Sequence, residues 1–460
     1  MYEPELAIAE PDRLVYAFGP FRLDLRRECL TYGVERIALP DRLYSILLAL
    51  VRANGSLVSR EELHALIWPG SAVSDNNLSQ HVYMLRRLLG ERAGDRLYIA
   101  TAHRKGFRFV ARVRVVESET LETSREQSIS EVYPEEPDLI VFRNFSRALK
   151  LVELGSGASL RSAVESLTEA VALDEQYAPA WIGLARAHLS LVQYGYCPKE
   201  VESTPARNAV FKALQIEGGS AAAHAVLANI MLFCDWDRRG AHREIDLAVQ
   251  MNPESSVVRT SAAWLHAWTG YPKRAAMEAR RALMSEPAST FLQFFLGRIL
   301  IYCGDYAAAI EHLSEVIQSS AEYASSGRRW RAQALLMDGR PQDALLDLTL
   351  MSGDRAEDLA GRLALLGQAY ASLDDKTRAE RIYDHLATTA QVEFVPELCM
   401  MQLALALGDC ERAVVHLEKA IRQKEPMLPL LRSSPALSPL NGSTAFKELM
   451  GAVGSCQMPS

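Results

Sequence analysis

Apolar positions near the start of the chain follow a strand-like alternation, and further along they recur at helical spacing. The strand-like positions are Val15, Phe18, Phe21, Leu23 and Leu25, before a turn at Tyr32-Gly33 and an apolar return at Ile37 and Leu39. After three short helical patterns, residues 97–112 alternate again and return through Phe107 and Phe109. This order of strands, helices and a closing hairpin predicts a small α+β module.

Three amphipathic helices are expected between residues 40 and 89. The first starts at Pro40-Asp41, stops at Asn54-Gly55 and has an apolar face formed by Leu43, Ile46, Leu47, Leu50 and Val51. The second is capped by Ser59, with Glu62 completing a capping box, and it ends at Pro69-Gly70. The third is capped by Ser74 or Asp75 and packs through Leu78, Val82, Leu85 and Leu89. Two helices joined by a turn and followed by a hairpin predict a winged helix-turn-helix.

The third helix is expected to enter the major groove of DNA. Its polar and outward positions are Asn77, Gln80, His81, Met84, Arg86 and Arg87. Asn and Gln side chains can read adenine edges, and Arg can read guanine. A plainer alternative for Arg86 and Arg87 is that they solvate the helix and neutralise its C-terminal dipole. His81 is interpreted as a phosphate contact, and a metal role is rejected because no second ligand lies at metal spacing.

The expected hairpin carries three successive basic or imidazole side chains at its tip, His103, Arg104 and Lys105, followed by Gly106. Arg108 is expected to point outward from the returning strand. Side chains at such a tip can lie in the minor groove or against phosphates. The alternative is an ordinary solvated turn. The position of the tip beside a helix-turn-helix favours DNA contact.

These segments resemble the winged helix of the OmpR/PhoB type. The matching positions are Arg60-Glu61-Glu62-Leu63 with Trp68, His81-Val82 with Leu85-Arg86 and Leu89, and Thr101 with Gly106-Phe107-Arg108-Phe109. The resemblance covers about a hundred residues and implies binding to tandem or repeated sites in double-stranded promoter DNA, which would accommodate a dimer. We do not expect phosphorelay control, because no phospho-acceptor receiver precedes the module. The predicted DNA contacts are Asn77, Gln80, His81, Met84, Arg86, Arg87, Thr101, His103, Arg104, Lys105 and Arg108.

A second pattern, with a period of about 34 residues, fills the remainder of the chain. Repeats start near Asn144, Ala178, Ala221, Ser256, Thr290, Ser325, Ala360 and Phe394. Small residues recur on the second helix of most repeats, as in Ala163/Leu167/Ala170, Ala206/Val210/Ala213, Ala241/Ile245/Ala248, Ala275/Ala279/Ala282 and Ala413/Leu417/Ala420. This period with small residues at helix crossings is the tetratricopeptide signature, and stacked repeats bury a shared face. Eight helix pairs in a right-handed superhelix with a long concave groove are expected.

The predicted fold class is therefore mainly α, with an N-terminal winged helix-turn-helix followed by an α-helical tetratricopeptide-repeat solenoid. The expected boundaries are 13–113 for the winged helix, 114–138 for an acidic flexible linker, and 139–450 for the repeats with a C-terminal cap. The linker is assigned because residues 115–138 are rich in Glu, Ser and Thr and poor in apolar residues.

The ninth position of each first helix is expected to face the groove. These residues are Val152, Arg186, Asn229, Trp264, Arg298, Gln333, Gln368 and Gln402. We select Arg186, Asn229, Trp264 and Arg298 as a site for a peptide, protein or small-molecule effector. The alternative is a wet concave face without a ligand. One repeat is longer by about nine residues at 195–200, which is either a functional lip or a tolerated loop.

Charge separates the two regions. Residues 13–113 contain 16 Lys+Arg and 9 Asp+Glu, a balance of +7, whereas the remaining 34 basic and 48 acidic residues give −14. A local positive field is enough to attract phosphates, because surface charges beyond a Debye length of about 8 Å are screened. The distribution therefore supports nucleic-acid binding by the N-terminal module alone.

Several function classes are excluded by the motifs that the chain lacks. No Walker A loop, H-E-x-x-H, G-x-S-x-G or clustered metal ligands are found, so we expect no enzyme, no cofactor and no metal site. The chain contains no run of about 18 apolar residues, so we expect no membrane span. The acidic N-terminus does not have the pattern of a signal peptide. Seven scattered cysteines are typical of reduced, mostly buried thiols in the cytoplasm.

The whole arrangement resembles the HilA-type and other OmpR-like regulators that carry tetratricopeptide repeats. A further match is Asp235-Trp236 followed by Ala241, Glu244 and Asn252-Pro253. The resemblance implies a cytoplasmic bacterial transcriptional regulator that binds promoter DNA, contacts RNA polymerase and is tuned by its repeats. The competing hypothesis is an interaction adaptor whose winged helix and repeat groove bind proteins. Target promoters, activation or repression, oligomeric state and effector identity cannot be read from the sequence.

Overall fold

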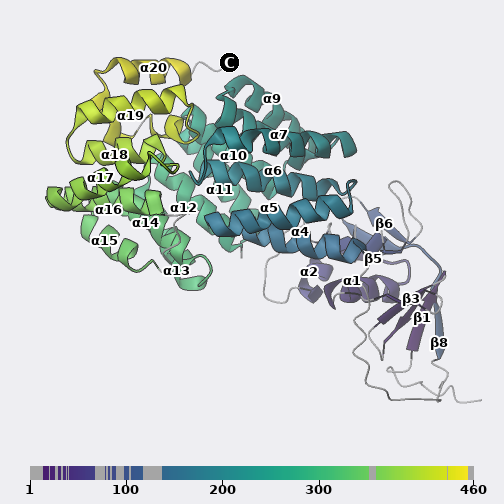
Figure 1. Cartoon of the computed structure of the whole chain (residues 1–460). Helices are drawn as coiled ribbons and strands as arrows, with labels where there is room; N and C mark the ends of the chain where they lie inside the picture. Colours follow the sequence, from purple (N-terminus) through teal and green to yellow (C-terminus); the bar gives the residue numbers. More distant parts are fainter. Residues whose placement is uncertain are drawn as a thin grey trace, which may run out of the picture. The chain divides into compact units, whose positions relative to one another are not determined.

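In the computed structural model the chain divides into two compact units, Met1–Phe142 and Arg143–Ser460 (Figure 1). The structure describes residues 14–19, 21–25, 29–32, 35–37, 39, 41–67, 78, 81–82, 85–86, 88–89, 98–102, 105–117, 137–287, 289–351, 359–432 and 434–453. Within these residues, no helix is both long and apolar enough to cross a membrane.

The N-terminal unit contains two antiparallel sheets. The first has the strand order β4-β3-β2-β1-β8, and the second has the order β5-β7-β6. The strands are β1 (Leu14–Phe18), β2 (Phe21–Asp24), β3 (Cys29–Tyr32), β4 (Glu35–Ile37), β5 (Leu57–Ser59), β6 (Ile99–Ala102), β7 (Gly106–Phe109) and β8 (Arg114–Glu117). The strand-like alternation near the start of the chain is thereby confirmed as a four-stranded meander, and the predicted hairpin is β6 and β7.

The first two helices begin where the sequence predicts, and the predicted end of the second at Pro69-Gly70 lies outside the described residues. Helix α1 (Asp41–Arg52) ends before Asn54 and Gly55, whose φ angles of 41° and 88° lie in the left-handed region. Helix α2 (Arg60–Ile67) begins with the expected capping box. The Glu62 amide donates to Ser59 Oγ over 3.1 Å, and the Ser59 amide donates to Glu62 Oε2 over 2.8 Å. These bonds satisfy two amides that a helix start would otherwise leave unpaired.

The structure extends this unit beyond the predicted limit at residue 113. Strand β8 pairs with β1, with Val116 opposite Val15 and Val115 opposite Tyr16. Assigning 114–117 to the flexible linker was therefore wrong. The side chains of Val115 and Val116 are 59% and 48% exposed, so the ladder with β1 and not burial holds the strand. An alternation of apolar residues could not reveal such a strand. The rest of the predicted linker up to residue 136 lies outside the described residues.

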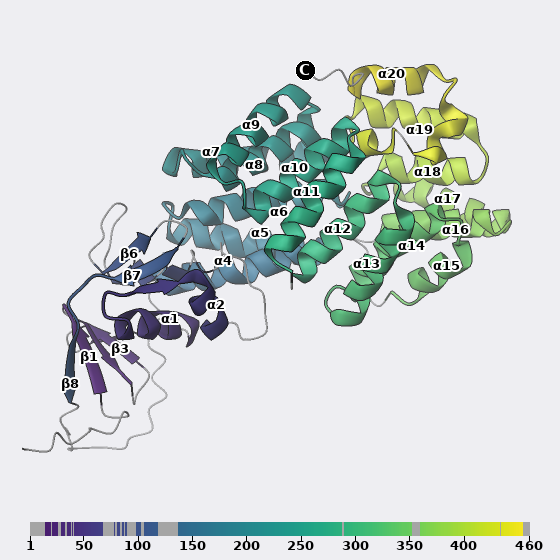
Figure 2. The ribbon, with the colours of Figure 1, turned by 180° about the vertical axis from the view of Figure 1, so that it is seen from behind.

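The second unit is built from helix pairs. Within residues 137–453, the described helices are α4 (Pro137–Leu154), α5 (Gly157–Leu173), α6 (Ala178–Gln193), α7 (Lys199–Ile216), α8 (Ala221–Ile230), α9 (Arg238–Met251), α10 (Ser256–Thr269), α11 (Pro272–Ser285), α12 (Thr290–Cys303), α13 (Tyr306–Ser319), α14 (Ala324–Met337), α15 (Pro341–Thr349), α16 (Leu359–Ser372), α17 (Lys376–Thr389), α18 (Glu397–Ala406), α19 (Cys410–Arg422) and α20 (Thr444–Val453). A π-helical turn, η2 (Met231–Asp235), follows α8, and two 3-10 turns, η4 (Leu428–Leu431) and η5 (Pro435–Leu440), precede α20. Figures 1 and 2 show α4–α19 stacked in chain order.

The eight predicted repeats correspond to the eight pairs from α4/α5 to α18/α19. Helices α6, α8, α10 and α12 begin at the predicted residues, and α14 and α16 begin one residue earlier. Helix α4 begins seven residues earlier than predicted, at Pro137, because the buried Val141 and Phe145 continue its apolar face. Helix α18 begins three residues later, after its N-cap Pro396. The cap extends to Val453, three residues beyond the predicted end.

Small residues allow the paired helices to approach closely. All fifteen predicted crossing residues are buried, and none is more than 4% exposed. Gly297 on α12 is an example, because a Cβ atom there would lie 2.7 Å from Leu313 Cγ on α13. Gly183 on α6 faces Leu167 on α5 in the same way, at 3.0 Å. Stacking therefore buries faces that a single pair would leave in water.

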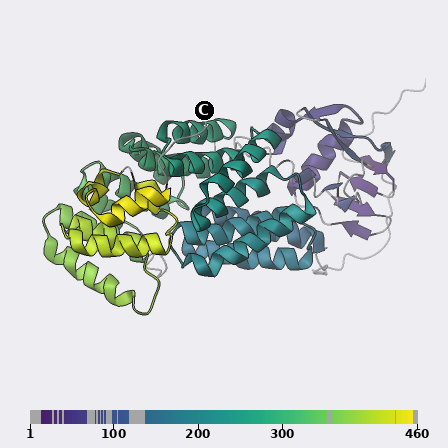
Figure 3. The ribbon, with the colours of Figure 1, turned by 90° about the horizontal axis from the view of Figure 1, so that it is seen from above.

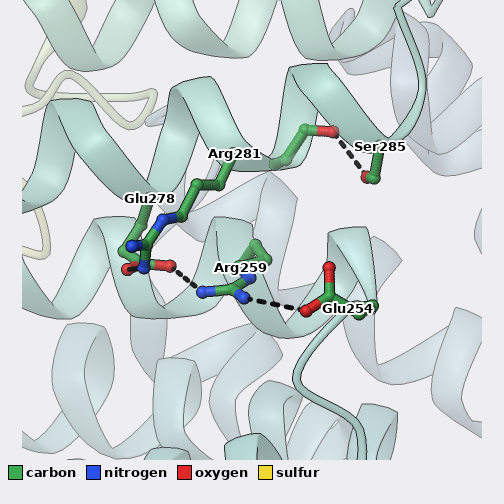
Figure 4. A network of polar contacts seen from close by, with 6 residues as sticks. Glu254, Arg259, Glu278, Arg281 and Ser285 are labelled. Carbon is green, nitrogen blue, oxygen red and sulfur yellow. Dashed lines mark hydrogen bonds and ion pairs between the residues drawn. The ribbon is translucent and has the colours of Figure 1, made fainter.

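Charged pairs also join the two helices of a repeat. Arg259 on α10 donates to Glu278 on α11 over 2.7 Å and lies 3.4 Å from Glu254 (Figure 4). Arg281 approaches the other oxygen of Glu278 at 2.9 Å. Arg331 and Asp347 form the equivalent pair between α14 and α15 over 2.6 and 2.7 Å. The alanine pattern that marks the repeats does not predict these pairs.

Hydrogen bonds also join repeats that are distant in sequence. Arg432 Nη1 donates to the Trp268 carbonyl over 2.9 Å, and Lys424 Nζ donates to the Asp235 carbonyl over 3.1 Å. Accordingly, the yellow C-terminal helices lie next to the teal middle repeats in Figure 3. At the other end, Ser326 Oγ donates to the Leu154 carbonyl over 3.3 Å. The predicted long open groove is therefore divided into cavities.

The cysteines differ in part from expectation. The six described cysteines are free thiols, and Cys29 and Cys234 are buried. Cys410 is exposed, and the other three are partly exposed, so the expectation of mostly buried thiols was wrong. Burial raises the pKa of Cys399 to about 12, which keeps this thiol protonated and poorly reactive at neutral pH. Cys456 lies outside the described residues.

Candidate functional site

The third helix of the N-terminal unit is anchored by the apolar face that the sequence predicts. Leu78, Val82, Leu85 and Leu89 are at most 3% exposed and pack with α1, α2 and the strands in one core. His81 is also buried, with 4% of its surface exposed. The expected phosphate contact at His81 is therefore corrected, because its imidazole lies inside the unit. A period of 3.6 places residue 81 beside Leu78 and Leu85, which is the signal that could have shown this.

Arg86 connects the third helix to the wing. Its Nε and Nη2 atoms donate to the Ile99 carbonyl over 3.1 and 2.9 Å, and Nη2 also donates to Thr101 Oγ1 over 2.7 Å. Both partners lie on β6. The expected DNA contact or solvating role of Arg86 is thus replaced by a positioning role. Thr101 accepts one of these bonds and is half-buried, so its role as a DNA contact stays a prediction.

The shape of the wing depends on Gly106. Its φ angle is 148°, and a Cβ atom there would lie 2.0 Å from the Val58 carbonyl oxygen on β5. Only glycine fits this approach of β5 to β7. The Lys105 amide donates to the Ala102 carbonyl over 2.9 Å and closes the turn before Gly106. The sequence predicted the unusual backbone but not the strand β5 that requires it.

Two predicted wing contacts are at the surface. Lys105 and Arg108 are both exposed. Arg108 lies on β7, opposite Leu57 on one side and Ala100 on the other, so its position is fixed by two ladders. The remaining predicted DNA contacts, Asn77, Gln80, Met84, Arg87, His103 and Arg104, lie outside the described residues.

In the repeat unit, the ninth positions of the first helices face the interior as predicted. Val152, Arg186, Asn229, Trp264 and Arg298 line one cavity of about 70 Å³. Gln333, Gln368 and Gln402 line a second cavity of about 380 Å³. Gln193 and Tyr194, at the end of α6, line both.

The four selected groove residues gather at the smaller cavity, and two of them form hydrogen bonds inside the repeat unit, Asn229 with Ser261 and Arg298 with Tyr194. Asn229 Nδ2 donates to Ser261 Oγ over 2.9 Å. The rings of Phe233 and Phe295 each meet Trp264 edge-on at 5.5 Å. A volume of about 70 Å³ is well below the roughly 300 Å³ of the smallest ordinary ligand pockets. Binding of a peptide, protein or small-molecule effector at these four residues stays a prediction.

Arg298 is the most enclosed of these side chains, at 4% exposure. Its guanidinium carbon lies 4.4 Å from the ring centres of both Tyr194 and Trp330, and Nη1 donates to the Tyr194 hydroxyl over 2.7 Å. The Nε and Nη2 atoms are buried without a hydrogen-bond partner. Arg298 therefore links α6, α12 and α14 by cation–π contacts across the interior.

Arg186 interacts electrostatically with a half-buried acid, Glu153. Burial raises the pKa of Glu153 to about 7, and Arg186 opposes that shift. Burial lowers the pKa of Arg186, and Glu153 raises it. The two charges compensate each other inside the repeat unit. Among the described residues, no group of three or more His, Cys, Asp or Glu side chains is arranged to hold a metal ion.

Sequence reasoning missed the main lining of the larger cavity. It includes Tyr302, Trp330 and Leu365 from first helices, and Met427 and Leu431 from the segment after α19. It also includes Gly195, Cys197, Pro198, Lys199 and Glu200 from the insertion between α6 and α7. The insertion was noted in the sequence as a lip or a loop, and its length was the signal for this part of the lining.

Comparisons with known proteins agree with the N-terminal geometry. The family model "Transcriptional regulatory protein, C terminal" matches residues 34–109. Transcriptional regulator HilA of Salmonella typhimurium is 32% identical over 101 residues, which cover 22% of this chain and 18% of HilA. The cholera toxin transcriptional activator of Vibrio cholerae is 32% identical over 87 residues, 18% of this chain and 30% of that protein. Residues 34–109 are thus an OmpR/PhoB-type DNA-binding domain, and the match spans less than a third of these relatives' lengths.

Solved structures are similar to this chain at low identity. A tetratricopeptide repeat protein from Parabacteroides merdae is 15% identical with a TM-score of 0.38, covering 59% of this chain and 99% of that one. A monomeric mutant of IFIT1 is 14% identical with a TM-score of 0.47, covering 69% of this chain and 71% of that one. The chain combines the DNA-binding domain with tetratricopeptide-like repeats.

Proposed function

We propose that this chain regulates transcription in the bacterial cytoplasm by binding double-stranded promoter DNA through its OmpR/PhoB-type domain. The observation that carries the proposal is the family match over residues 34–109. The exposure of Lys105 and Arg108 on the wing supports it. The local balance of +7 over residues 13–113 provides the attraction for phosphates.

The third helix and the wing have different roles in this proposal. Gln80, Asn77, Met84 and Arg87 on the third helix read base edges in the major groove. His103, Arg104, Lys105 and Arg108 on the wing hold phosphates or enter the minor groove. Arg86, with Thr101, holds the helix at a fixed distance from the wing and does not itself contact DNA. Tandem sites would place two copies of the chain side by side.

The repeat unit would transmit control to the DNA-binding domain or to RNA polymerase. Tetratricopeptide-like stacks present large interior and exterior surfaces to partners. In this proposal an effector that binds the repeats changes the effect of the DNA-bound chain on transcription from the promoter. Contact with RNA polymerase then converts DNA binding into a change in transcription.

The test is selection of duplexes from a random library by the full-length protein, followed by binding titrations with the selected duplex. Gln80→Ala should change preference among base substitutions in the site, because it removes a base contact. Arg104→Ala with Lys105→Ala should weaken binding to every duplex alike, because it removes phosphate contacts. Lys150→Ala, an exposed change in the repeat unit, serves as the control.

Two outcomes would contradict different parts of this proposal. Equal effects of the Gln80 variant and the wing variant on all sequences would contradict the division between base reading and phosphate holding. Failure of the full-length protein to enrich any duplex would contradict DNA binding and would favour the interaction adaptor instead.

A further inference from the structure

The larger cavity in the repeat unit has the dimensions of a small-molecule site. Its volume is about 380 Å³, within the range of about 300–1,000 Å³ that is usual for ligand pockets. Aromatic and aliphatic side chains form most of the wall, notably Tyr302, Trp330, Leu365, Phe394 and Leu431. Such a lining suits an organic molecule with an apolar body about the size of a fused ring.

Two amide groups in this cavity lack a partner. The Nε2 atoms of Gln193 on α6 and Gln368 on α16 are buried without any hydrogen-bond acceptor. An unpaired buried donor destabilises the folded protein, because it loses its bonds to water. The two glutamines come from separate repeats and line the same cavity. Acceptors on a bound molecule that reach these two atoms would satisfy them.

Contacts between separate segments of the chain form the rim of the larger cavity. Gly195 in the α6–α7 insertion has a φ angle of 74°, and a Cβ atom there would lie 3.0 Å from Pro396 Cγ at the start of α18. On the far side, Glu425 accepts hydrogen bonds from the Glu397 and Leu398 amides over 2.6 and 2.9 Å. The first contact brings the α6–α7 insertion against the start of α18, and the second ties the start of α18 to the segment after α19. A tolerated loop would not need such a fit.

We propose that the larger cavity binds a small organic molecule with a ring-sized apolar body and a planar oxygen-bearing head, either a carboxylate or a carboxamide. The apolar body contacts Tyr302, Trp330 and Leu365, and the head accepts hydrogen bonds from Gln193 and Gln368. Binding itself follows from the cavity alone, whereas its use as an effector signal rests on the proposed regulatory function.

Isothermal titration of the full-length protein with three naphthalene probes tests the proposal. The probes are 1-naphthoate, the neutral 1-naphthamide and the cationic 1-naphthylmethylammonium. At least one of the first two should bind with 1:1 stoichiometry, and the cation should bind at least tenfold more weakly because it offers no acceptor. The ratio of the first two affinities tells whether a charged or a neutral head is preferred.

Two cavity variants and one control sharpen the result. Gln368→Leu should weaken binding of the better probe at least tenfold while raising the midpoint of urea unfolding, because it removes an unpaired buried donor. Ala364→Phe should abolish binding by filling the cavity while the helical circular dichroism is retained. Gln391→Leu, at an exposed position outside the lining, should leave binding unchanged.

The results that would contradict ligand binding differ from those that would contradict DNA binding. Absence of binding by every probe at millimolar concentration, or equal affinity of the wild type and Gln368→Leu, would overturn the inference. A lower unfolding midpoint in Gln368→Leu would also overturn it, since the amide would then serve the fold. Anisotropy titrations with selected duplex are run on the same preparation. Probe binding without DNA binding would instead refute only the proposed function.

Discussion

Arg86 was predicted from the sequence to contact DNA, but in the structure its side chain connects the third helix to the wing. The sequence places it on the third helix beside Arg87, with nothing to distinguish the two. In the structure its guanidinium is committed to the Ile99 carbonyl and Thr101 Oγ1 on β6. A hydrogen bond across 13 or 15 residues of chain depends on tertiary placement, so a periodic pattern cannot predict it.

The first prediction compares Arg86 with an arginine at the surface of the same unit. Arg86→Met should lower the free energy of unfolding by about 1.5–3 kcal/mol, the usual contribution of hydrogen bonds to a charged group. It should also weaken DNA binding, because the helix and wing lose their connection. Arg108→Met should weaken DNA binding and leave stability nearly unchanged. Urea unfolding and anisotropy measure the two effects. Unchanged stability of Arg86→Met would contradict the positioning role.

The second prediction concerns pH and Glu425. Burial raises the pKa of this carboxyl to about 7, and its bonds to the Leu398 and Glu397 amides only partly oppose the shift. Between the ordinary pKa of about 4.5 and pH 7, the folded protein keeps a proton that the unfolded chain releases. Stability from this group therefore falls as pH rises through that window.

Glu425→Gln isolates this contribution. Glu153, whose pKa burial also raises to about 7, remains in the variant and changes stability in the same direction. The stability of the wild type relative to Glu425→Gln should therefore fall between pH 5 and 7, as measured by urea unfolding at several pH values. A difference that stays constant across this range would show that Glu425 does not titrate there.

At the scale of elements, what could be predicted depended on how an element is stabilised. The repeat helices α6, α8, α10 and α12 begin where the sequence places them, because each repeat buries a regular alanine-rich face. Strands β5 and β8 were missed because they are short, and β8 has exposed valines and is held by its ladder to β1. Hydrophobic periodicity detects burial and does not detect pairing.

The third prediction tests the revised domain boundary. If β8 is part of the sheet, backbone amides in a peptide spanning residues 114–117 should exchange with deuterium much more slowly than an unstructured segment of the same sequence. Pairing with β1 is the physical reason. Mass spectrometry of peptic fragments from the full-length protein gives the rates. Exchange at the unstructured rate from residue 114 onward would restore the boundary at 113.

At the scale of the whole molecule, the repeat interior could be predicted only in part. The ninth-position rule identified eight residues that all line one of two cavities. The rule did not predict that the two cavities differ in size. Their sizes depend on contacts such as Arg298 with Tyr194, which are 104 residues apart. Closure of a superhelix on itself is set by summed small rotations between repeats, and local patterns do not specify it.

DNA binding by the N-terminal unit is the central claim, and its dependence on salt tests it most directly. About four phosphate contacts by the wing give a slope near −3.6 for the logarithm of the binding constant against that of salt concentration. The affinity of the full-length protein for a selected duplex should thus fall about a hundredfold between about 50 and 200 mM salt. A change of less than about threefold over the same range would contradict phosphate contact and, with it, the proposed function.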